Sequence, residues 1–82
     1  MKITIESTTK IVIIKPSPLS DGVQARIWEG TSETGIKVMC YIARVAIPDE
    51  EQEKADQFRS ELIECKSPSI EAEAIPMRLI LD

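Results

Sequence analysis

The chain of 82 residues contains no histidine, only two cysteines, and one residue each of Trp, Tyr and Phe. Without imidazole, Ser-His and Cys-His nucleophiles are excluded, and so are histidine ligands for a metal. Cys40 and Cys65 are too few to close a zinc site or to build a disulfide-rich secreted scaffold. We expect them to fill the core, with a disulfide as the alternative if helix and sheet bring them together. The composition argues against an enzyme and predicts no cofactor.

Long apolar runs and clusters of basic residues are also missing. The apolar run at residues 11–14 is far too short to span a bilayer, and residues 1–10 lack the apolar segment of a signal peptide. These features predict a cytoplasmic protein with no membrane partner. No Lys/Arg stripe is present to neutralise phosphates, so direct binding to nucleic acid is not expected.

The length allows one domain, residues 1–82, with a core built from Ile, Val, Leu and Met rather than from aromatic residues. A domain of this size is marginally stable alone. Contact with a partner, or formation of a homo-oligomer, would therefore stabilise it.

The most regular β pattern lies between residues 23 and 47, where β-branched and aromatic residues flank a short turn bounded by Gly30 and Gly35. Alternation in the first strand places Ala25 and Ile27 on the core face and Arg26 and Trp28 on the opposite face. In the second strand the pattern slips near residues 43–44, and a β-bulge there would explain the shift.

Residues 2–6 and 10–15 are also predicted strands, separated by a polar break at residues 7–9, and residues 76–81 form the last strand. A helix is predicted at residues 50–64, with Asp49 as its N-cap and a narrow apolar stripe on one side. Residues 69–74 remain unassigned. The predicted fold is α+β: a mostly antiparallel sheet of four to five strands with one helix packed on one face, in the order β-β-β-β-α-β.

No segment is predicted to cover the second face of this sheet, which makes that face a candidate binding surface. Trp, Tyr, Arg and Met are enriched at protein interfaces, and an arginine beside aromatic rings can hold a planar or anionic ligand. Alternatively, Trp28 packs under the last strand or under the loop at residues 16–21. The candidate partner- or ligand-binding residues are Arg26, Trp28, Lys37, Met39, Tyr41 and Arg44.

Negative charge is concentrated in the predicted helix. Residues 49–64 hold seven acids and two bases, a net charge of −5, which leaves +1 for the rest of the chain whose total is −4. Such a helix is either a solvated exterior or a surface presented to a basic partner, for example a nucleic-acid-binding protein. Glu29 and Glu33 flank the predicted turn without a partner for acid-base chemistry, and we expect them to be solvated.

Several segments together carry a resemblance: ARIWEG at residues 25–30, GIKVMCYIARVAI at residues 35–47, Phe58-x-x-x-Leu62, and the closing residues 75–81. From about Gly22 onward the chain resembles small uncharacterised proteins encoded by bacteriophages and prophages. The resemblance implies no catalytic or ligand-binding residues. It implies a context, because small accessory phage proteins often bind and block, or sequester, a component of the host.

Three hypotheses follow. The first is a non-enzymatic binding module, a phage accessory protein that blocks a host defence or nucleic-acid-binding protein and anchors on Trp28, Arg26, Tyr41 and Met39. The second is an oligomer that sequesters a nucleotide-type small molecule, with arginine or lysine against phosphate and an aromatic ring against the base. The third is a structural phage component that only self-assembles.

Overall fold

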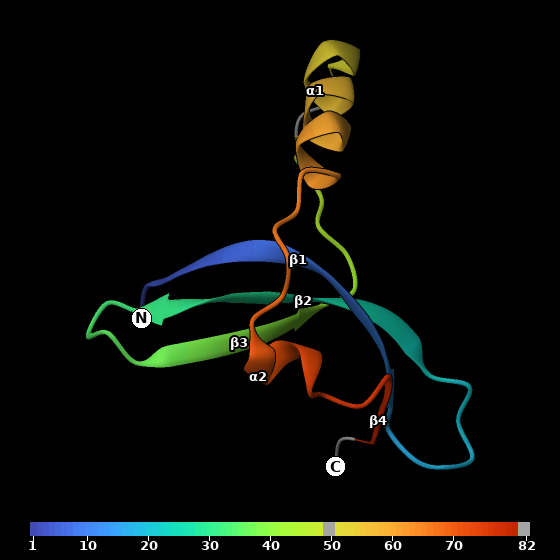
Figure 1. Ribbon diagram of the computed structural model, residues 1–82. Helices are drawn as coiled ribbons and strands as arrows, with labels where there is room; N and C mark the ends of the chain where they lie inside the picture. Colours follow the sequence, from blue (N-terminus) through green and yellow to red (C-terminus); the bar gives the residue numbers. More distant parts are fainter. Residues whose placement is uncertain (49–50, 81–82) are drawn as a thin grey trace.

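The computed structural model describes residues 1–48 and 51–80 and shows a four-stranded sheet with two helices (Figure 1). The elements are β1 (Ile3–Lys15), β2 (Val23–Ser32), β3 (Lys37–Ile42), α1 (Gln52–Leu62), α2 (Ile70–Glu73) and β4 (Arg78–Ile80). The sheet order is β3-β2-β1-β4, with only β4 parallel to its neighbour. The prediction of an α+β fold with a mostly antiparallel sheet is confirmed, although the element order is β-β-β-α-α-β.

The two strands predicted in the first fifteen residues are one long strand, β1, bent at an irregularity. Its register against β2 shifts between Ser7, opposite Trp28, and Ile11, opposite Arg26. Thr8 lies in this bulge and is fully buried. Its hydroxyl donates to the Ile27 carbonyl at 2.7 Å and accepts the Lys10 N–H at 3.2 Å. The polar break is therefore a bulge inside a strand, because Thr8 replaces the ladder hydrogen bonds that the bulge removes.

The predicted hairpin is present, with its turn centred on residues 33–36. Gly35 has φ of +89°, which favours glycine, and its N–H donates to the Ser32 carbonyl at 3.0 Å. Gly30 does not bound the turn as expected. It lies inside β2 opposite Ile5, where the two backbones approach closely. β3 ends at Ile42, so the bulge expected at residues 43–44 is wrong.

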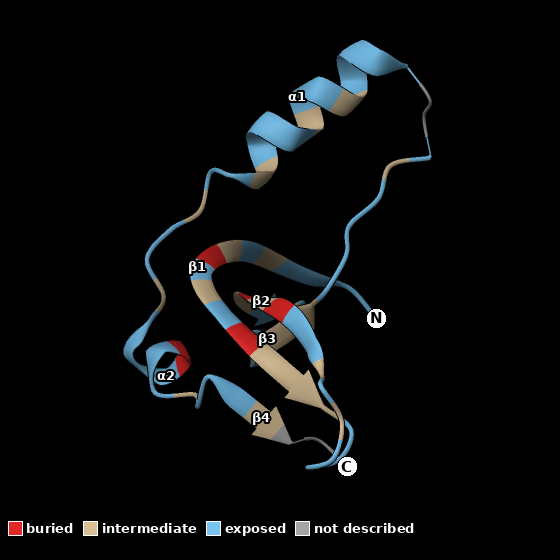
Figure 2. Cartoon of the chain, turned by 90° about the vertical axis from the view of Figure 1, so that its right-hand side faces the viewer, coloured by how far each residue is buried: buried red, intermediate tan, exposed pale blue. Residues whose placement is uncertain are grey.

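The core lies on one face of the sheet, beneath α2. Val12, Ala25, Ile27 and Ala72 are buried, and partly buried side chains pack around them: Ile14, Met39, Tyr41 and Ile75. Buried positions are marked on β1, β2 and α2 (Figure 2). Ser69 caps α2, because its hydroxyl accepts the Ala72 N–H at 3.2 Å. The previously unassigned segment is thus the element that covers the core face.

Helix α1 stands away from the sheet, which corrects the expectation of a helix packed across one face (Figure 1). None of its eleven residues, all of them described, is buried, although Phe58 and Leu62 are partly covered. The returning chain is fastened to the β1 bulge, since the Lys66 N–H donates to the Ser7 carbonyl at 3.2 Å and the Lys66 carbonyl accepts from the Thr9 N–H at 3.0 Å. Helix α1 is therefore an arm that projects from the sheet.

Two predicted features lie at the ends of the described segments. The predicted N-cap Asp49 lies outside the described residues, and α1 begins after Glu51. The final strand is present as Arg78–Ile80, while Leu81 lies outside the described part.

Cys40 and Cys65 are free and partly buried. No helix in the described residues is long and apolar enough to cross a membrane.

Candidate functional site

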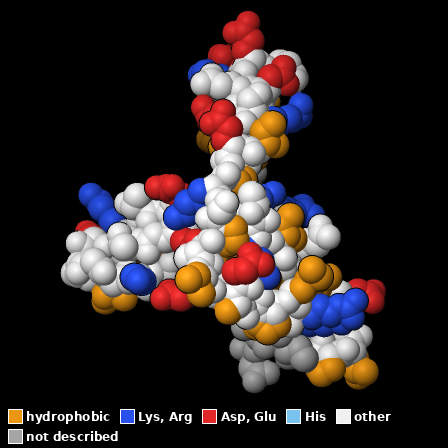
Figure 3. Space-filling view, in the orientation of Figure 1, with side chains coloured by type: hydrophobic (Ala, Val, Ile, Leu, Met, Phe, Trp, Pro, Cys, Tyr) orange, Lys and Arg blue, Asp and Glu red, His pale blue; other side chains and the backbone are white. Residues whose placement is uncertain are grey.

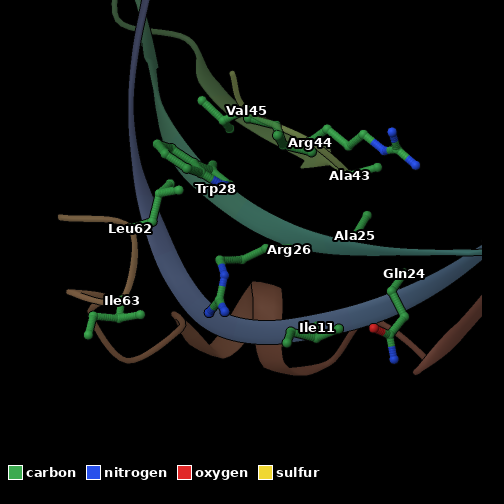
Figure 4. Close-up of a pocket in the computed structure, with 11 residues that line it drawn as sticks. Ile11, Gln24, Ala25, Arg26, Trp28, Ala43, Arg44, Val45, Leu62 and Ile63 are labelled. Atoms are coloured by element: carbon green, nitrogen blue, oxygen red, sulfur yellow. The ribbon is translucent and has the colours of Figure 1, made fainter. Parts of the chain in front are cut away.

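The sheet face opposite α2 carries a groove of about 320 Å³, which we call the Trp28 groove (Figure 4). Strands β1, β2 and β3 form its floor, and the C-terminal end of α1 and residues 43–45 form its sides. Its lining residues are Ile11, Gln24, Ala25, Arg26, Trp28, Ile42, Ala43, Arg44, Val45, Leu62 and Ile63.

One end of the Trp28 groove is apolar. Trp28 lies beside Leu62 and Val45 (Figure 4), and it lines a neighbouring hollow together with Phe58. The ring therefore packs against the end of α1, and neither expected alternative, the last strand or the loop at residues 16–21, covers it. Ile63 is 81% exposed, so this end presents uncovered apolar surface.

Two guanidinium groups give the Trp28 groove its charge. Arg26 is half-buried, and its Nη1 donates to the Thr8 carbonyl at 2.7 Å, which holds the side chain in place across the bulge. Arg44 is exposed, points away from Trp28 (Figure 4), and forms no ion pair with any described residue. The groove thus combines apolar walls with one positioned cation and one cation available at the rim, which suits a ligand with an apolar group beside an anion.

The expected cluster of six binding residues is split by the register of the hairpin. Cys40 lies opposite Trp28, whereas Met39 lies opposite Glu29 and Tyr41 opposite Ile27. Because opposite residues in an antiparallel pair share a face, Met39 and Tyr41 belong to the core face, where both pack around the buried residues. The prediction that they neighbour Trp28 is wrong.

Lys37 also lies on the core face, at its edge. Its ammonium is 3.9 Å from Glu71 of α2. It lines, with Met39 and Ser69, a second hollow of about 410 Å³ between β3 and the start of α2. Three of the six predicted residues therefore line the Trp28 groove: Arg26, Trp28 and Arg44.

Glu29 remains partly exposed, and beyond the contact with solvent expected from the sequence it fastens α2 to the sheet. It accepts hydrogen bonds from the Ser69 hydroxyl and, at 3.0 Å, from the Ser69 N–H. These bonds, with the hydroxyl contributing most, lower the pKa of Glu29 below its ordinary range. The pair links β2 to the N-cap of the helix that covers the core.

The sequence did not identify the residues that complete the groove from outside the sheet: Val45, Leu62 and Ile63. Leu62 belongs to the apolar stripe of the predicted helix. The stripe predicted that the helix packs against another part of the chain, but it did not indicate which part. Within residues 1–48 and 51–80, no group of three or more His, Cys, Asp or Glu side chains could hold a metal ion. The groove itself offers apolar side chains and two guanidinium groups.

Comparison with known proteins gave no further assignment: no protein-family model, no curated protein and no solved structure matches the chain. Function is therefore inferred from the residues of the groove and the arm.

Proposed function

We propose that the chain is a non-enzymatic binding module, a phage accessory protein that occupies and blocks a site on a host protein. The observation that carries this proposal is the unusual amount of uncovered surface. The accessible surface is 6475 Å², whereas a globular protein of 9.2 kDa has roughly 4,900 Å². The radius of gyration is 14.3 Å, against about 12 Å for a compact chain of this length.

This surplus is large enough to serve an interface. It amounts to roughly 1,500 Å² above the surface expected for the mass, and one side of a standard protein interface covers about 800 Å². Helix α1 contains no buried residue, and Ile11 and Val45 are each 41% exposed at the groove. A partner seated in the Trp28 groove would cover apolar side chains that the chain itself leaves in water.

The chemistry of the groove specifies what it receives. Trp28 and Leu62 would contact a large apolar side chain, and Arg44 would pair with a neighbouring carboxylate at the rim. Arg26 still has free N–H donors while its Nη1 is held by Thr8. The preferred occupant is thus a protein segment with an acidic residue next to an apolar one.

The acidic arm contributes in a different way. Residues 51–64 hold five acids and two bases, and acidic side chains are prominent on the projecting arm (Figure 3). The bases already pair along the helix, Lys54 with Glu51 at 3.8 Å and Arg59 with Asp56 at 3.4 Å. The remaining negative charge would steer the arm toward a basic surface, as found on nucleic-acid-binding proteins, and would mainly accelerate association.

Selection from a display library of random peptides tests the groove. Peptides that bind the protein should share an acidic residue beside a large apolar residue. Selection on the Arg44→Glu variant should lose this acidic preference, because the rim cation becomes an anion. Lys2→Glu makes the same change in charge at an exposed residue outside the groove and should keep the preference. Identical peptides from Arg44→Glu and the unmodified protein would contradict the proposal.

A nucleotide-type small molecule is the second candidate, because the groove volume of about 320 Å³ lies within the roughly 300–1,000 Å³ of small-molecule sites. Trp28 would stack on a base and Arg44 would pair with phosphate. A nucleotide present at a hundred times its Kd stabilises by about 2.7 kcal/mol, which raises Tm by roughly 10 °C or more in a domain of this size. A panel of nucleotides without any such shift would exclude this candidate.

A further inference from the structure

Strand β3 forms one edge of the sheet and has an unprotected outer side. Among the described strands, β2 alone pairs with it, in the order β3-β2-β1-β4 (Figure 1). The opposite edge is closed differently, because β4 has only three residues and the Lys66 segment is fastened to β1 beside it. Among the described strands, β3 is therefore the edge that is open to pairing with another strand.

The hydrogen-bonding pattern of the hairpin shows which backbone groups of β3 face outward. Ser32 N–H donates to the Ile36 carbonyl at 2.8 Å, so this pair is hydrogen-bonded. In an antiparallel ladder such pairs alternate, so Val38, Cys40 and Ile42 direct their N–H and C=O groups toward β2. The residues between them, Lys37, Met39 and Tyr41, direct theirs outward. Three donors and three acceptors are thus aligned on the outer side of β3.

The side chains of β3 do not prevent pairing. Edge strands are usually protected by prolines, bulges, very short length or charged residues along the edge. Residues 38–42 are five consecutive apolar or aromatic residues without any of these devices, and the only charge, Lys37, lies at the start of the strand. A strand of this composition favours addition of another strand.

We propose that a second copy of the chain pairs with this edge, β3 against β3 in antiparallel orientation about a two-fold axis perpendicular to the sheet. The charge of the strand does not oppose this pairing. When the axis lies at Met39, Lys37 meets Tyr41 of the second copy; when it lies at Cys40, Lys37 meets Ala43. No like charges are opposed in either register. The surplus surface of the single chain is consistent with such an association.

The pairing would join two four-stranded sheets into one continuous sheet. Because the axis is perpendicular to the sheet, both Trp28 grooves would lie on the same face, and both α2 helices on the other. Each groove is lined by Ile42 and Ala43, which adjoin the paired edge. The dimer would therefore present two grooves side by side to a repeated or two-fold symmetric partner.

The first test is the mass in solution. Native mass spectrometry and sedimentation at micromolar concentration should give twice the chain mass of 9.2 kDa. Met39→Pro should give the single-chain mass with a retained β-sheet spectrum, because its N–H faces outward and proline is tolerated at such an edge position. Arg44→Glu, which tests the groove, should keep the doubled mass, so failure of the groove proposal and failure of the dimer are distinguishable. A single-chain mass for the unmodified protein would overturn the dimer.

Cysteine cross-linking tests the interface without a proline in β3. Cys65→Ser leaves Cys40 as the sole thiol, and Met39→Cys combined with Cys40→Ser and Cys65→Ser moves the thiol by one residue. Copper-phenanthroline oxidation should link the dimer in one of these proteins, because one of the two residues lies opposite its own copy. Ser17→Cys in a background without the native thiols, at an exposed loop position, is the control and should form no rapid link. Absence of a rapid link at both β3 positions would overturn the proposal.

Discussion

Replacement of Gly30 by alanine is expected to be the most damaging single-methyl change in the sheet. A Cβ added there would lie 1.7 Å from the Thr4 carbonyl oxygen and 2.7 Å from the Ile5 Cα, both backbone atoms of β1. Contacts under 3.0 Å do not occur for real Cβ atoms, so the strands would have to separate by roughly 1.3 Å. Separation of that size breaks the neighbouring ladder hydrogen bonds, and we expect a loss of at least about 3 kcal/mol.

Gly35→Ala is the matched control, because it adds the same methyl group but is destabilising for a different reason. No described atom lies within 4 Å of the added Cβ, but φ of +89° strains any residue with a side chain. The expected cost is about 1–2 kcal/mol. Urea unfolding followed by the fluorescence of Trp28, the only tryptophan, measures both variants. A Gly30→Ala protein as stable as Gly35→Ala, or more stable, would refute the close approach of β1 and β2.

Three further changes test the core, the bulge and the α2 fastening. Ile27→Ala should cost about 2–5 kcal/mol in urea unfolding, because the side chain is fully buried in a very small core. Thr8→Val should cost about 1–3 kcal/mol, since it leaves the Ile27 carbonyl and a backbone N–H of the bulge without their partner. The Ser69 bonds lower the pKa of Glu29 in the folded protein, so they stabilise it at pH values above the ordinary pKa of glutamate, about 4.3, and this contribution is lost as the pH falls below it. Glu29→Gln should therefore reduce the dependence of Tm on pH in this range, whereas Glu33→Gln should not; equal pH profiles for all three proteins would contradict this.

The strand β2 shows what the sequence could specify. Its strict alternation placed Ala25 and Ile27 in the core and Arg26 and Trp28 on the other face, and the structure agrees. In β3 the same reasoning failed, because apolar residues occupy both faces from Val38 to Ile42 and alternation cannot choose between them. The turn sets the register there, and a shift of one residue moved Met39 and Tyr41 away from the candidate site.

The long-range arrangement of the elements could not be predicted from the sequence, for a different reason. The polar residues 7–9 read as the end of a strand, and only the hydrogen bonds of Thr8 to distant backbone show why the strand continues. The apolar stripe of α1 predicted that the helix packs on the sheet, but the chain after the helix is fastened at the β1 bulge through Lys66, and no residue of the helix is buried. The groove is formed where these two long-range features meet, so its outer wall could not be foreseen.

A fluorescence titration of Trp28 with a selected acidic-apolar peptide tests the central claim most directly, because the reporter is itself a wall of the groove. The proposed binding mode predicts a saturable change in Trp28 emission and a Kd at least about tenfold higher for Arg44→Glu, which corresponds to about 1.4 kcal/mol. Lys2→Glu should keep the original Kd. Equal affinity of Arg44→Glu and the unmodified protein, or binding without any change in Trp28 emission, would contradict the assignment of the Trp28 groove as the binding site.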